Sequence, residues 1–113
     1  MPIRKDKPLA WLHVEVKSPP FSAAARLETG FLLRRLQRGD LLAMPHSRPM
    51  PDIGPRCHEL RIDDFLVRWR LVYRIDTDAI VIAMAFVKKS AKTPRSVFDL
   101  CRQRFKEYDS AGC

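Results

Sequence analysis

The chain has 113 residues, which suits one domain with a modest core, and its 46% hydrophobic and 30% charged residues exclude a disordered protein. The formal net charge of +8 favours RNA, DNA or an acidic protein as a partner over a basic surface that serves only solubility. No apolar run approaches the length of a membrane span, and three cysteines without a CxxC pair match no zinc template, so we expect a cytoplasmic protein without a metal ion.

The N-terminal half predicts a strand followed by a helix. Residues 1–8 are polar, contain two prolines and predict a loose lead-in. Residues 9–16, LAWLHVEV, alternate in part and predict a strand. A serine and two prolines at 18–20 then predict the start of a helix over residues 21–38. Apolar residues recur in this helix at three- and four-residue steps and predict one buried stripe: Phe21, Ala24, Ala25, Leu27, Phe31, Leu32 and Leu36.

The C-terminal half predicts a loop, three strands and a helix. Residues 41–56 hold four prolines and form a long loop, a kind of segment that is often functional. Strands follow over residues 57–62, 67–75 and 79–87, and the last is apolar at every position, as is typical of an interior strand. Thr93 and Pro94 predict the cap and first turn of the final helix.

This order of elements predicts the fold class. A strand, a helix, three consecutive strands and a helix indicate an α+β fold in a single domain over residues 1–113. We expect a small antiparallel sheet of about four strands. An N-terminal helix, or helical pair, and a C-terminal helix should pack on one side of it.

Basic side chains predict the functional surface. Successive strand residues point to opposite faces, so Arg68, Arg70 and Arg74 leave the strand 67–75 on one face, with Trp69 and Tyr73 on the other. More cations lie on the neighbouring strand, after the last strand and in the first turn of the final helix: Arg61, Lys88, Lys89, Lys92 and Arg95. In a meander these segments are neighbours, which predicts one concave basic patch for a phosphate.

Such a patch suits the cleavage of RNA. Attack by a 2′-hydroxyl needs a proton acceptor, cations for the phosphate charge and an acid for the leaving oxygen. Arginine suits the second role, and a lysine with a pKa lowered by neighbouring cations suits the first or third. His58 is the histidine nearest to the arginine strand and is a possible acid or base.

The motifs resemble those of a known family. CHELRI, RWRLVYRI and AMAFVKKSAKTP, followed by a basic helix, resemble the HigB-like, phage-derived branch of the RelE/ParE toxin superfamily. The resemblance extends from about Trp11 to Tyr108. It implies a RelE-like fold and the toxin of a type II toxin–antitoxin system, an endoribonuclease that cuts mRNA on the ribosome without a cofactor. It also implies an antitoxin, a helix-turn-helix protein encoded next to the toxin, and no membrane partner.

The resemblance also implies roles for individual residues. Arg70 matches the strand arginine that stabilises the scissile phosphate, and Lys88 and Lys89 match the basic pair after the last strand. The implied contacts to the RNA backbone come from five further residues: Arg61, Arg68, Arg74, Lys92 and Arg95. The tyrosine that RelE carries early in its last helix is absent, and Arg95 stands near its place, so the general base stays open.

Two other functions stay open at this stage. ParE-like members of the superfamily resemble inhibitors that bind DNA gyrase, and this chain shares their general pattern. A degenerate toxin that only binds RNA or a protein partner would also keep the basic patch.

Overall fold

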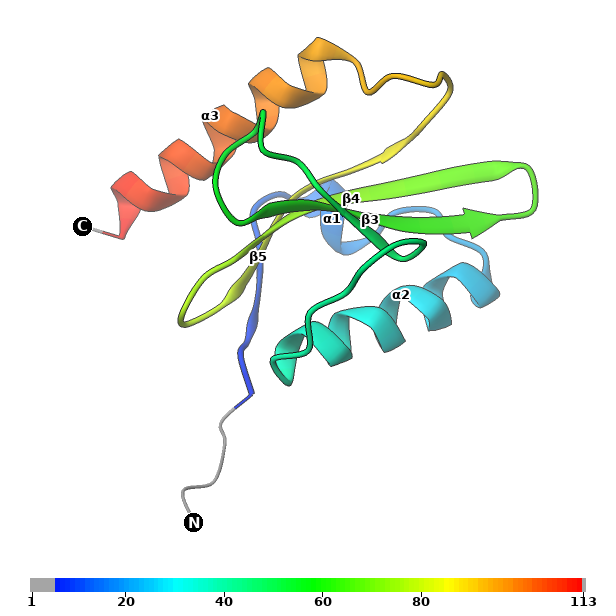
Figure 1. Cartoon of the computed structure of the whole chain (residues 1–113), viewed down its shortest axis with the longest axis horizontal. Helices are drawn as coiled ribbons and strands as arrows, with labels where there is room; N and C mark the ends of the chain where they lie inside the picture. Colours follow the sequence, from blue (N-terminus) through cyan, green and yellow to red (C-terminus); the bar gives the residue numbers. More distant parts are fainter. Residues whose placement is uncertain (1–5, 113) are drawn as a thin grey trace.

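The computed structural model describes residues 6–112 as a five-stranded sheet with helices on both faces (Figure 1). The elements in chain order are β1 (Leu9–Trp11), α1 (Val14–Lys17), α2 (Ala23–Gln37), β2 (Ser47–Pro49), β3 (Cys57–Asp64), β4 (Val67–Ile75), β5 (Ile80–Val87) and α3 (Arg95–Ala111). The strand order is β1-β5-β4-β3-β2. Since β1 runs parallel to β5 and the other neighbours are antiparallel, the sheet is mixed. The predicted α+β class is confirmed, but the sheet is not purely antiparallel.

Helices α2 and α3 lie on opposite faces of the sheet, not on one side as the sequence predicted (Figure 1). On the α2 side, Leu32 and Leu36 pack with Leu60, Leu71 and other apolar strand residues. A second core lies under α3 and contains mostly small apolar side chains: Cys57, Val72, Val81, Ala83, Val97, Cys101 and Phe105 are among its members. Burial of both faces explains why β5 is apolar at every position.

The alternation predicted for β4 is confirmed. Trp69, Leu71 and Tyr73 belong to the core on the α2 side, and Val72 belongs to the core on the α3 side. Pairing with β3 sets Arg61 opposite Arg70 and Asp63 opposite Arg68, so the arginines leave the sheet on the α3 face.

A β-bulge in β5 changes the side on which its later residues lie. Tyr73 pairs with Ile82 while Val72 pairs with Met84, which leaves Ala83 as the extra residue. Ala83 and Met84 consequently both contact the core on the α3 side, although they are adjacent in sequence. The alternation then resumes with Phe86 on that side. The bulge thus directs the end of β5 towards the arginine face.

The N-terminal third differs from the prediction in three ways. The strand ends at Trp11, and a short helix α1 follows that buries Val16 completely. Ser22, not Ser18, caps α2, since its Oγ accepts a hydrogen bond from the amide of Ala25 at 3.1 Å. Pro19 and Pro20 precede the cap and form no helical turn.

The buried stripe of α2 is also rotated from the predicted one. Leu27 and Phe31 are 77% and 63% exposed, whereas Thr29 and Leu33 are buried. Thr29 can be buried because its hydroxyl donates to the carbonyl of Ala25 at 2.7 Å.

The proline loop, the β3–β4 turn and the N-terminal segment also depart from the prediction. The proline loop contains β2, which pairs with β3. Asp63 and Asp64 extend β3, and the turn falls on Phe65 and Leu66. Of the expected lead-in, residues 1–5 lie outside the described residues, whereas the amide of Lys7 donates to the carbonyl of Gln37 at 2.9 Å, so this part is held against α2.

Candidate functional site

A fully buried carboxylate organises the basic residues on the α3 face. Glu59 is 0% exposed, and its Oε1 lies 3.4 Å from Arg48 Nη2, 3.8 Å from Arg70 Nε and 4.0 Å from Arg61 Nη1. Its Oε2 accepts a hydrogen bond from Thr93 Oγ1 at 3.3 Å. A carboxylate is buried at such a position only when opposite charges and donors surround it, and here they do.

Strand register explains why these charges meet. Arg48 on β2 pairs with Glu59 on β3, and Arg61 on β3 pairs with Arg70 on β4. Two cations directly opposite each other repel, so the carboxylate beside them makes their approach possible. Register alone therefore brings residues from three strands to one point on the α3 face.

Lys88 completes this group. Its amide donates to the carbonyl of Arg68 at 2.8 Å, which continues the pairing between β4 and β5. Partial burial lowers the pKa of Lys88, and the nearby guanidinium groups lower it further, while Glu59 acts in the opposite direction. We name Arg48, Glu59, Arg61, Arg70 and Lys88 the Glu59 cluster. Its four cations exceed its one carboxylate, so the cluster is positive.

Arg70 lies at the bottom of the cluster and is only 2% exposed. Its Nη1 donates to the carbonyl of Trp69 at 2.9 Å and to Asp63 Oδ1 at 3.2 Å. Its Nε is buried and has no hydrogen-bond partner among the described residues. Three cations of the cluster reach the surface: Lys88, which is half-buried, and Arg48 and Arg61, whose side chains are 40% and 25% exposed.

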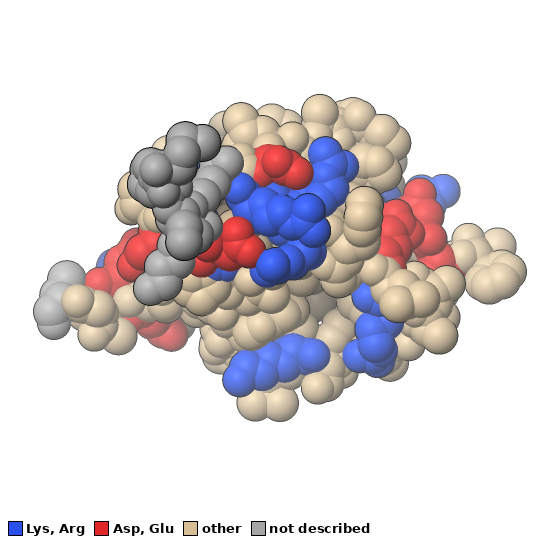
Figure 2. Space-filling model, turned by 90° about the horizontal axis from the view of Figure 1, so that it is seen from below, with Lys and Arg blue, Asp and Glu red and all other residues tan. Residues whose placement is uncertain are grey.

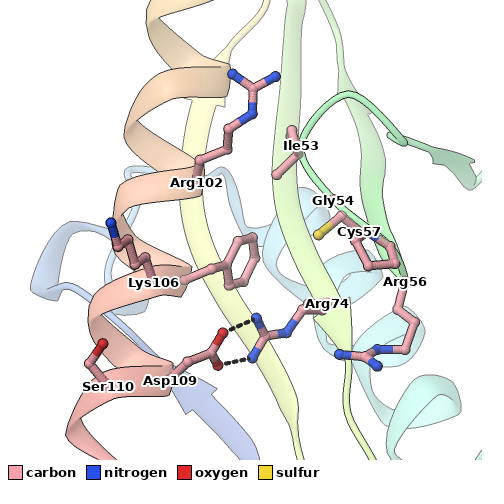
Figure 3. A pocket seen from close by; sticks show the side chains of 11 residues that line it. Ile53, Gly54, Arg56, Cys57, Arg74, Arg102, Lys106, Asp109 and Ser110 are labelled. Carbon is pink, nitrogen blue, oxygen red and sulfur yellow. Dashed lines mark hydrogen bonds and ion pairs between the residues drawn. The ribbon is translucent and has the colours of Figure 1, made fainter.

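Arg74 does not join the predicted patch. Its guanidinium is held by Asp76 on one side, with Nε at 2.7 Å from Oδ1. On the other side it is held by Asp109 of α3, with Nη2 at 2.6 Å from Oδ1 (Figure 3). These hydrogen bonds raise the pKa of Arg74 and lower that of Asp109. The guanidinium also lies over the ring of Phe105 at 4.8 Å. Arg74 therefore ties β4 to α3.

Arg74 lines a separate cleft of about 470 Å³ between α3 and the loop before β3 (Figure 3). Cys57 lies in the wall of this cleft, and burial raises the pKa of its thiol to about 11. Burial also raises the pKa of Cys101, in the α3 core, to about 12. Both thiols are therefore protonated and unreactive near neutral pH.

His58 lies on the opposite face of the sheet from the Glu59 cluster. Its ring stacks on Tyr73 with centroids 5.3 Å apart, and its Nδ1 lies 3.1 Å from the carbonyl of Arg56. Tyr73 is in the core on the α2 side, where its hydroxyl is 2.6 Å from Ser47 Oγ. His58 is thus not placed to exchange a proton at the cluster.

The remaining predicted residues are exposed. Arg68 lies near the β3–β4 turn, Lys89 and Lys92 lie between β5 and α3, and Arg95 is the first residue of α3. Thr93 does not cap α3, since Pro94 takes the cap position without a side-chain hydrogen bond and the Thr93 hydroxyl binds Glu59. Arg74 and His58 are thus the predicted site residues whose side chains lie away from the Glu59 cluster.

Two members of the cluster were missed by the sequence analysis. Arg48 was hidden in the proline loop, because a three-residue strand has too little periodicity to be recognised. Glu59 stands two residues before Arg61 in CHELRI, and this spacing in a strand indicates that the two side chains share a face.

Basic residues also gather outside the cluster. Figure 2, which views the molecule from the α2 side, shows Lys and Arg together near the centre of that face. α2 contributes Arg26, Arg34 and Arg35, and Arg38 follows as its C-cap. Two of these are neutralised, since Arg34 pairs with Asp6 at 2.8 Å and Arg35 with Asp40 at 3.4 Å.

Two kinds of feature are absent from residues 6–112. No group of three or more His, Cys, Asp or Glu side chains in this range is arranged to hold a metal ion. None of the helices in this range is both long and apolar enough to pass through a bilayer.

Comparison with known proteins identifies a matching family. A family model described as "Phage derived protein Gp49-like (DUF891)" matches residues 20–106, which is most of the chain and includes the whole Glu59 cluster. No curated protein matches the chain at a significant level.

Proposed function

The chain belongs to the Gp49-like phage-derived protein family, which is associated with toxins of toxin–antitoxin systems, and from this premise we propose that it is a ribosome-dependent mRNA endoribonuclease. The observation that carries the proposal is the Glu59 cluster, in which four cations meet on one sheet face. A phosphate that is attacked by a neighbouring 2′-hydroxyl gains negative charge, and preorganised cations stabilise that charge most effectively.

We assign the roles within the cluster by exposure and proton affinity. Arg48 and Arg61 reach the surface and would hold the scissile phosphate, together with Lys89 and Lys92 on the adjoining loop. Lys88, whose pKa is lowered, would donate a proton to the leaving 5′-oxygen.

For Arg70 we propose an indirect role. Because it is almost fully buried, its guanidinium would act through its charge and its contact with Glu59. Its positive charge, which lies beneath the surface cations, would then stabilise the negative charge on the phosphate without direct contact.

The proposed partners follow from the family. We propose a cognate antitoxin, a helix-turn-helix protein encoded beside the toxin, that covers the basic surface and suppresses activity in the cytoplasm. The net charge of +8 favours an antitoxin whose contacting segment is acidic.

Brief induced expression followed by mapping of mRNA 5′ ends tests the enzymatic proposal. The wild-type protein should produce new ends at a fixed position within codons. Replacement of Lys88 by alanine should lower the cleavage rate by about 10²-fold or more, since a positioned proton donor contributes about that much. Arg38→Ala is the matched control, because Arg38 is exposed on the other side of the sheet at the end of α2.

Two outcomes would contradict the proposal. Wild-type protein that inhibits growth through a DNA-damage response, without mRNA cuts, would support gyrase binding instead. A Lys88→Ala protein that cuts mRNA as fast as wild type would remove the proposed proton donor.

A further inference from the structure

A second cleft adjoins the Glu59 cluster. It has a volume of about 360 Å³ and lies between the β2 end with its following loop and the segment that leads into α3. Arg48 and Thr93 line it, and both also contact Glu59, at 3.4 and 3.3 Å. Any group that occupies this cleft would therefore be a direct neighbour of a phosphate held by the cluster.

The lining of the cleft combines apolar side chains with charged and hydroxyl groups, which come from Arg48, Asp52, Lys92 and Thr93. Pro49 and Pro51 come from one wall and the half-buried ring of Phe98 from the other. The carboxylate of Asp52 is exposed at the same cleft. An aromatic ring next to side chains that can form hydrogen bonds is a combination that binds an unstacked RNA base.

The wall that carries Asp52 is held in place before any ligand binds. The amide of Met50 donates to the carbonyl of Cys57 at 2.9 Å, and that of Ile53 donates to the carbonyl of Met50 at 3.0 Å. Arg102 of α3 donates through Nε to the carbonyl of Asp52 at 2.9 Å. Such a fixed wall lowers the cost of ordering on binding.

We propose that this cleft binds a nucleobase that carries an exocyclic amino group, beside the phosphate held by the Glu59 cluster. The inference rests on the proposed function and adds a base preference to it. A carboxylate accepts hydrogen bonds and donates none, so Asp52 favours the exocyclic amino groups of adenine, cytosine and guanine. Uracil is disfavoured, because its base donor, N3–H, lies between two carbonyl oxygens that repel the carboxylate. Phe98 supplies a stacking surface that is common to all four bases.

Titration with the four nucleoside 5′-monophosphates, followed by NMR of the backbone amides, tests this directly. In the wild-type protein, shifts should concentrate at Asp52, Thr93 and Phe98. AMP, CMP or GMP should bind about five-fold or more tightly than UMP, the lower limit expected for one specific base contact.

Three variants separate the roles. Asp52→Asn should abolish the preference over UMP, because its amide can also donate to a uracil carbonyl. Phe98→Leu keeps an apolar side chain and should weaken all four nucleotides together. Asp78→Asn is the control, since Asp78 is an exposed turn residue that lines other clefts.

The result that would overturn the inference is either shifts confined to another surface or a base preference unchanged in Asp52→Asn. This titration needs no cleavage. Absence of mRNA cuts would therefore refute the proposed function without affecting the nucleotide result, and the reverse also holds.

Discussion

Replacement of Glu59 by alanine should destabilise the protein far more than loss of any exposed carboxylate. Glu59 is 0% exposed, and the side chain of Arg70 beside it is 3% exposed. Breaking such a buried pair costs about 3–5 kcal/mol, because the remaining guanidinium stays buried and keeps only the exposed Asp63 as a counter-charge. Asp63→Ala is the matched control, since it removes a carboxylate that is 74% exposed from the same guanidinium. That change should cost about 1 kcal/mol or less.

The free energy of unfolding, obtained from urea denaturation followed by circular dichroism, measures both changes. In a domain of this size about 1 kcal/mol corresponds to a shift in Tm of roughly 4 °C, so Glu59→Ala should lower Tm by roughly 12–20 °C. If the two variants lose the same stability, the reasoning is refuted. Should Glu59→Ala fail to fold, the double variant Glu59→Leu/Arg70→Leu provides the test. It should recover much of the loss, because well-packed apolar groups replace a buried ion pair at little cost.

Three further predictions concern protonation. Since the pKa of Lys88 is lowered, the rate of mRNA cleavage should begin to fall at a lower pH than it would with an ordinary lysine as the proton donor. The Lys88→Arg variant should move this fall to higher pH. An unshifted pH–rate profile would exclude Lys88 as the proton donor. With Cys113 replaced by serine, neither Cys57 nor Cys101 should be alkylated by iodoacetamide at about pH 8 in the folded protein, as counted by mass spectrometry, because their thiols stay protonated; rapid native labelling would contradict this. Because its pKa is lowered, ionised Asp109 stabilises the fold fully above the ordinary pKa of about 3.8, and this stabilisation is lost as the pH falls through the lowered pKa. The Asp109→Asn variant should therefore lose less stability than wild type between about pH 5 and pH 2. Equal losses of unfolding free energy in urea titrations would refute the assignment.

Periodicity predicted the parts of the fold in which one physical rule dominates. The alternation of β4, the apolar run of β5 and the existence of α2 were all visible in sequence. The orientation of α2 was not, because Leu27 and Phe31 also satisfy helical spacing and only tertiary packing decides which stripe is buried. Residues 9–16 were misassigned for a similar reason, since a buried Val16 is equally compatible with a strand or a short helix.

The candidate site was predictable as a set of cations but not as a geometry. Arg61, Arg70 and Lys88 could be grouped because a meander places consecutive strands side by side. Alternation also placed Arg74 on their face, yet four residues along a strand is far enough to bring it under α3, where carboxylates neutralise it. The contacts of Glu59 depend on the strand register, which is set by the β3–β4 turn and by β2. Neither the position of this turn nor β2 was correctly predicted.

The bulge at Ala83 has a consequence for how this protein encodes its chemistry. A strict two-residue period from Ile82 onwards would bring Lys88 out among the leucines of the α2 layer, with every charged residue still present in the sequence. The one extra residue, Ala83, reverses the alternation and places Lys88 on the face of the sheet that carries the Glu59 carboxylate. A homologue without this extra residue would keep the lysines that follow β5 in its sequence but would place Lys88 on the α2 face of the sheet.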